Sequence, residues 1–99
     1  MIEFKEKQYS LKFNLGILDK IERALGQSVM SIVLQGTMTF YQYFTCFGFA
    51  LFNADGNKVD FEQGYELAQE YIQFKGYTPA VQEMMVAMNE DCPFLFQGD

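Results

Sequence analysis

Residues 40–52, FYQYFTCFGFALF, form an uncharged aromatic segment at the centre of the chain. Phe40, Phe44, Phe47 and Leu51 recur at intervals of three and four residues, which is the spacing along one face of an α-helix. Aromatic residues also favour sheets, but the segment is longer than an ordinary strand. We therefore expect a central helix that is buried on most sides.

The stretch around this segment contains no charged side chain between Arg23 and Asp55, which is also a feature of membrane spans. A spanning helix needs about 20 predominantly apolar residues, and here the longest nearly apolar run covers only residues 43–52. We therefore expect a buried helix and no membrane insertion. Gly48 would cost about 1 kcal/mol relative to Ala within a helix, so we expect it to permit a close helix crossing.

Two short segments before the first helix alternate apolar and polar residues, which predicts half-buried strands. Ile2 and Phe4 share one face of the first, and Tyr9, Leu11 and Phe13 share one face of the second. The polar residues 6–8 between them predict a hairpin turn. Because an isolated hairpin is marginally stable, its apolar face is expected to pack on the helices.

After Phe13 the apolar period changes from two to 3.6, which predicts amphipathic helices. Asn14 is a suitable N-cap for the first helix, and Gly26 can end it in a left-handed conformation. Ser28 can cap a short second helix that Gly36 closes.

Two more helices are expected in the second half of the chain. Asp60 and Gln63 have the spacing of a capping box, and Gly76 can end the helix that follows. Thr78-Pro79 predicts the start of the last helix, because Pro is favoured at the first helical position. Pro93 lies beyond its end. The chain is thus predicted to be mainly α, at the margin of α+β, with an N-terminal β-hairpin packed on four to five helices in a single domain, residues 1–99.

Composition excludes several functions. The 99 residues include 49% hydrophobic and 20% charged residues, which is ordinary for a folded protein. Seven basic against 13 acidic residues give a net charge of −6, which argues against nucleic-acid binding. The chain has no histidine, so it lacks the commonest general base and metal ligand. We assign no catalytic, cofactor-binding or metal-binding residue, and we expect the protein not to be an enzyme.

Two acidic patterns have simpler interpretations than a site. Residues 53–64 resemble a calcium loop, but Lys58 stands where the loop needs Gly, and Gly64 stands where it needs a bidentate Glu. Glutamates recur every four residues from Glu62 to Glu70, which is typical of a solvated helix face. The N-terminus lacks the apolar stretch of a signal peptide, so we expect a cytoplasmic protein with reduced thiols at Cys46 and Cys92.

The C-terminal end has the best candidates for binding a protein partner. A methionine stripe on a terminal helix more often completes the core, but methionine side chains also repack around different partners. A short apolar tail must either fold back on the core or dock on another chain. The last predicted helix has a methionine stripe, and a Phe-Leu-Phe cluster follows Pro93, so both features occur next to each other. The candidate partner-binding residues are Val81, Met84, Met85, Met88, Phe94, Leu95 and Phe96.

A family resemblance is carried by residues 13–26, FNLGILDKIERALG, in which a Leu-Gly start and an Ala-Leu-Gly end bracket a helix. An extended stretch precedes it, and a short helix, a large apolar segment and acidic amphipathic helices follow. This order resembles the tail assembly chaperones of long-tailed bacteriophages and prophages. The aromatic richness of residues 40–52 is not a mark of that family.

The resemblance implies a non-enzymatic role in the host cytoplasm. Such chaperones coat the tape measure protein, keep its long apolar helices soluble, and give way as the tail tube protein polymerises around it. The alternatives are a structural phage component, such as a head–tail connector or minor tail protein, and a small bacterial protein-binding module. Self-association of the C-terminal end is also consistent with the pattern.

Overall fold

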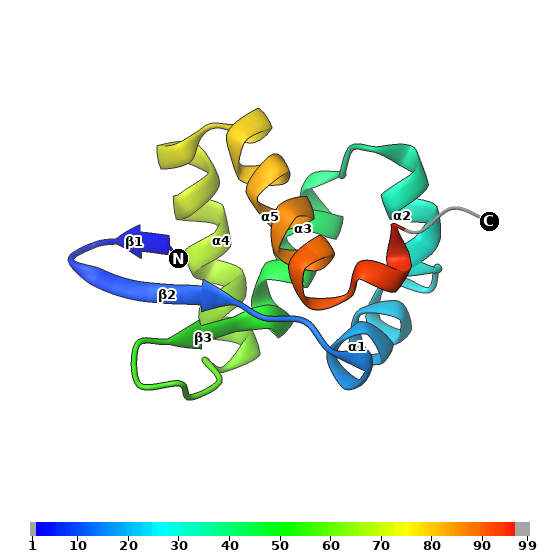
Figure 1. The fold of residues 1–99 in the computed structure, drawn as a ribbon. Helices are drawn as coiled ribbons and strands as arrows, with labels where there is room; N and C mark the ends of the chain where they lie inside the picture. Colours follow the sequence, from blue (N-terminus) through cyan, green and yellow to red (C-terminus); the bar gives the residue numbers. More distant parts are fainter. Residues whose placement is uncertain (1, 97–99) are drawn as a thin grey trace.

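The computed structural model describes residues 2–96. This part of the chain is mainly α-helical, with a small antiparallel sheet at one end of the helices (Figure 1). Its elements in chain order are β1 (Ile2–Phe4), β2 (Lys7–Leu11), α1 (Leu15–Leu25), α2 (Val29–Gln35), α3 (Phe40–Ala50), β3 (Leu51–Asn53), α4 (Phe61–Lys75), α5 (Tyr77–Asp91) and the 3-10 turn η1 (Pro93–Leu95). The predicted fold class, a hairpin packed on five helices, is confirmed.

The sheet has the order β1-β2-β3, and both strand pairs are antiparallel. Its hairpin turn lies at Lys5 and Glu6, one position earlier than predicted, and both residues have positive φ angles of 55° and 63°. Such angles are typical of the two-residue hairpin turns that match strand twist. Strand β3 was not predicted, and it pairs Leu51 with Leu11 across the sheet.

The aromatic segment is a helix only as far as Ala50. Leu51, predicted to lie on the helical stripe, instead begins β3, where it is buried against β2. The middle of α3 is buried as expected, and Phe47 lies in the core. The first turn differs, because the Phe40 side chain is 60% exposed and stacks on the half-buried Phe44.

The close helix crossing expected at Gly48 is confirmed, and its partner is Gly64 of α4. A Cβ atom at Gly64 would lie 3.1 Å from the Gly48 Cα, and one at Gly48 would lie 2.9 Å from the Phe61 ring. The absence of both Cβ atoms therefore lets the backbones of α3 and α4 approach closely. This crossing places α3 at the centre of the helices (Figure 1).

The helix starts predicted from Asn14 and Ser28 are confirmed, and Thr39 starts α3 in the same way. Each of the three side chains accepts a backbone N–H of the first turn. The starts of the last two helices lie close to the predicted positions but differ in their capping or first residue. Asp60 precedes α4 but makes no capping hydrogen bond. Helix α5 begins at Tyr77, before Thr78-Pro79. Pro is tolerated in this first turn, where N–H groups have no helical partner.

The core extends from the sheet through α3 to the helices around it. Its largest fully buried side chains include Ile21, Ile32, Tyr43, Phe47, Leu51, Met84 and Met88. Within residues 2–96, no helix is both long and apolar enough to cross a membrane.

Candidate functional site

The structure divides the predicted partner-binding residues into two groups. Helix α5 turns its methionine stripe inward against the rest of the molecule, so that Met84 and Met88 are completely buried. Side chains that complete the core cannot contact a partner while the domain stays folded. Four of the seven candidate residues are thus buried in the core, namely Val81, Met84, Met88 and Leu95.

The remaining three candidates are accessible to different degrees. Phe94 and Phe96 are 50% and 39% exposed, and Met85 is half-buried. Leu95, between the two phenylalanines, is buried and anchors the η1 turn to the core. The turn therefore holds Phe94 and Phe96 at the surface on a fixed backbone.

The end of α5 is held to the segment that precedes α1 by a specific hydrogen bond. The Asp91 carboxylate accepts the backbone N–H of Phe13 at 2.8 Å. Cys92, the next residue, is buried, and its N–H donates to the Met88 carbonyl at 2.7 Å. These contacts fix the position from which η1 leaves the helix.

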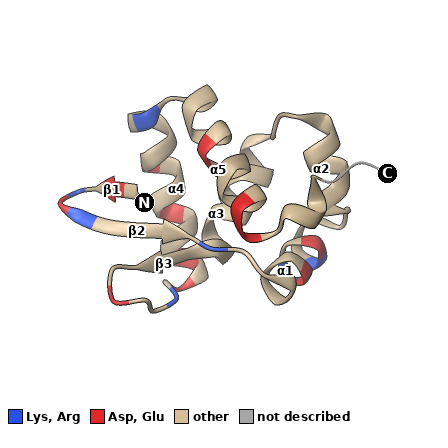
Figure 2. Ribbon diagram, viewed as in Figure 1, with Lys and Arg blue, Asp and Glu red and all other residues tan. Residues whose placement is uncertain are grey.

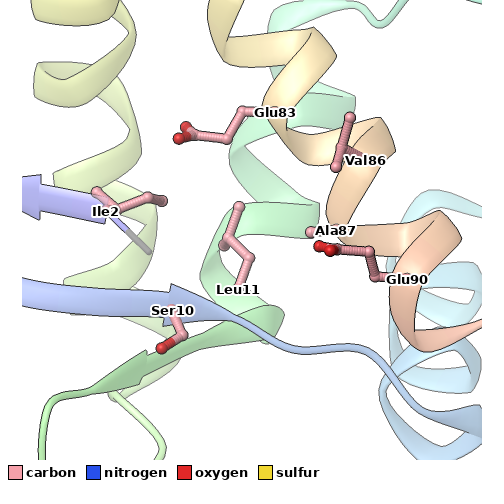
Figure 3. Close-up of a pocket in the computed structure, with 7 residues that line it drawn as sticks. All are labelled: Ile2, Ser10, Leu11, Glu83, Val86, Ala87 and Glu90. Carbon is pink, nitrogen blue, oxygen red and sulfur yellow. The ribbon is translucent and has the colours of Figure 1, made fainter.

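A second feature, which the sequence pattern did not predict, is a groove of about 250 Å³ between β2 and α5 (Figure 3). Glu83 and Glu90 extend from α5 toward it, and Leu11 rises from β2 between them in this view. The other lining residues are Ile2, Ser10, Val86 and Ala87. The spacing of two helical turns between Glu83 and Glu90 places both on the side of α5 that borders the sheet.

The Glu83 side chain has a fixed position in this groove. The buried Tyr71 hydroxyl donates to Glu83 Oε1 at 2.7 Å. Burial raises the pKa of Tyr71, and the hydrogen bond to Glu83 raises it further. The nearby Tyr43 is buried with no hydrogen-bond partner for its hydroxyl among the described residues, and burial again raises its pKa. Both tyrosines are therefore neutral at physiological pH.

The loop that resembles a calcium site uses its polar groups internally. The Asn53 side-chain oxygen accepts the N–H groups of Asp55 and Asn57 at 3.0 Å each. The Lys58 ammonium donates to the Gly48 carbonyl at 2.8 Å, near the end of α3. These bonds make the segment a structured turn. Within residues 2–96, no group of three or more His, Cys, Asp and Glu is arranged to hold a metal ion.

The other acidic and thiol groups have structural surroundings. Glu62, Glu66 and Glu70 are exposed on α4, as predicted, and Glu70 pairs with Lys5 of the hairpin turn. Cys46 and Cys92 are both free and buried. Burial raises the pKa of the Cys46 thiol to about 12, so it is unreactive in the folded protein.

Comparison with protein-family models, with curated proteins and with solved structures gave no match to this chain. The features of the described residues from which a function can be inferred are the exposed η1 turn and the groove beside α5.

Proposed function

We propose that this chain is a non-enzymatic tail assembly chaperone of a long-tailed phage or prophage. It binds the tape measure protein in the host cytoplasm and assists assembly of the tail tube around it. The proposal is supported by the resemblance of residues 13–26, in which a Leu-Gly start and an Ala-Leu-Gly end bracket the segment that forms helix α1.

The observation that carries the proposal is the exposure of Phe94 and Phe96 on a turn that the buried Leu95 anchors. Aromatic side chains contribute large contact areas to protein interfaces. The η1 turn contains no charged residue (Figure 2), so a partner can cover it without desolvating a charge. Such a surface suits the apolar face of a partner helix.

Co-expression with the tape measure protein tests this proposal. We expect the tape measure protein to stay soluble only when this chain is present, and to co-purify with it. The double substitution Phe94→Ser and Phe96→Ser should abolish this effect, while Phe74→Ser should retain it. Phe74 is a matched control, because it is an aromatic residue that is 69% exposed at the end of α4.

Three results would contradict the proposal. If the tape measure protein is equally soluble without this chain, the chaperone role fails. If the chain instead persists in purified phage particles, it is a structural component such as a head–tail connector or minor tail protein. A chain that binds only a host protein would be a small bacterial protein-binding module.

A further inference from the structure

We propose that the groove between β2 and α5 binds one Lys or Arg side chain of the protein partner. Its aliphatic part would lie against Leu11 and Ile2, and its charged end would lie between Glu83 and Glu90. This inference rests on the proposed function, because it requires a protein partner, and it adds the chemistry by which that partner is recognised.

Charge complementarity selects a cation for this groove. The two carboxylates extend from one face of α5 toward the groove (Figure 3). Among the described residues, no basic group forms an ion pair with either of them. Lys12, which follows β2, holds its ammonium 5.7 Å from the centre of the Phe52 ring. The negative charge of the groove is therefore available to a cation from outside the chain, and the net charge of −6 would attract a basic segment.

The shape of the groove selects a long side chain. Ile2, Leu11, Val86 and Ala87 provide apolar walls beside the two carboxylates. Lys and Arg bury their aliphatic part on apolar surface while the charged group stays at a polar rim. The volume of about 250 Å³ is below the roughly 300–1,000 Å³ of drug-sized ligand sites, so a single side chain fits better than a cofactor.

The position of Glu83 is suited to binding before any partner arrives. The Tyr71 hydroxyl donates a hydrogen bond of 2.7 Å to Oε1 of this carboxylate and holds the side chain in place. Fixing a binding group in advance lowers the entropy that binding would cost. Val86 is 57% exposed at the edge of the groove, where it can contact the partner backbone. A partner helix with one central basic residue on an apolar face meets these requirements.

Two synthetic helical peptides test the inference directly. Both contain Leu at intervals of three and four residues, and they differ only at one central position, which is Arg in one and the neutral isostere citrulline in the other. Methyl NMR of the whole protein measures binding, since Leu11, Val86 and Ala87 have methyl groups at the groove. We expect the Arg peptide to bind about tenfold more tightly and to shift these signals, as charge-assisted hydrogen bonds are stronger than neutral ones.

Matched variants locate the effect. Glu83→Gln with Glu90→Gln should reduce the preference for Arg to about twofold or less, because the residual attraction would come only from distant charges. The side-chain oxygen of Gln at position 83 can still accept the hydrogen bond from the Tyr71 hydroxyl. Glu62→Gln with Glu66→Gln removes the same charge from the exposed face of α4 and should retain the full preference. Circular dichroism melting confirms that all variants fold.

Several outcomes would overturn the inference. Equal binding of the two peptides would show that the charged contact does not contribute to binding. The chaperone proposal would remain intact, because co-expression tests that role separately. Loss of the preference in the α4 variant but not in the groove variant would place the site elsewhere. Absence of binding by both peptides would reject the groove as a docking site. Binding of free arginine amide as tightly as the peptide would indicate a small amine as the ligand.

Discussion

The middle of α3 and residues 84–96 are both rich in apolar and aromatic side chains, yet only the first is buried at most of its positions. Helix α3 is covered by α4, α1 and the sheet. The C-terminal end alternates, so that Met84, Met88 and Leu95 face the core while Phe94 and Phe96 face outward. The difference shows that the number of neighbouring elements, more than apolar content, decides whether an apolar segment is core or surface.

The largest expected effect comes from truncating one aromatic residue in each region. Phe47→Ala should lower the free energy of unfolding by about 3–5 kcal/mol, because it leaves a cavity beside Tyr43 and Tyr71. Phe94→Ala should change it by less than about 0.5 kcal/mol, as for most surface substitutions. Urea denaturation measures both. Equal losses would show that the C-terminal end is as much a part of the core as α3.

A smaller effect is expected where α3 crosses α4. Gly64→Ala places a Cβ 3.1 Å from the Gly48 Cα. The resulting overpacking should destabilise the domain by about 1–3 kcal/mol, even though Ala is the better helix former by about 1 kcal/mol. Gln63→Ala, at an exposed position one residue away, is the control and should leave the stability nearly unchanged. Thermal melts of both variants measure the two effects. A more stable Gly64→Ala variant would mean that the helices do not cross closely there.

The third test leaves the sequence unchanged, since each region contains one buried thiol. Cys46 lies in α3, and Cys92 follows α5. Burial raises the pKa of both thiols, with Asp91 adding to the shift at Cys92, so each reacts only after an opening motion. Cys92 should react with a thiol reagent at least about tenfold faster, because the segment after α5 packs against fewer elements than α3 does and therefore opens more easily. Mass spectrometry of the labelled peptides gives both rates, and equal rates would mean that the two regions open together.

Those parts of the fold that depend on local chemistry could be predicted from the sequence. Three helix starts follow from residues whose own side chains make the capping hydrogen bonds, namely Asn14, Ser28 and Thr39. Strand β3 could not be predicted, because Leu51 and Phe52 continue the aromatic pattern of α3 and become a strand only by pairing with β2. That pairing depends on a distant segment, which a local pattern does not contain.

The same limit applies to the candidate site. The sequence identified the apolar character of residues 81–96, but periodicity alone did not show which side of α5 the other helices cover. The groove beside Glu83 and Glu90 arises only when α5 lies against β2. Its one local signal was the two-turn spacing of these glutamates around Val86 and Ala87, a pattern that exposed helices also show.

The pairing of β2 with β3 has a consequence for the order of folding. Tyr9 meets Asn53 in the sheet, so this contact must close a long loop of chain that contains α1, α2 and α3. Helices form from local contacts in about a microsecond, whereas contacts between distant segments form slowly because the entropy of loop closure must be overcome first. We therefore expect α3 to form before the strand that continues it. Ala50 and Leu51 are neighbours in the chain, yet Ala50 would take up its structure early in folding and Leu51 late.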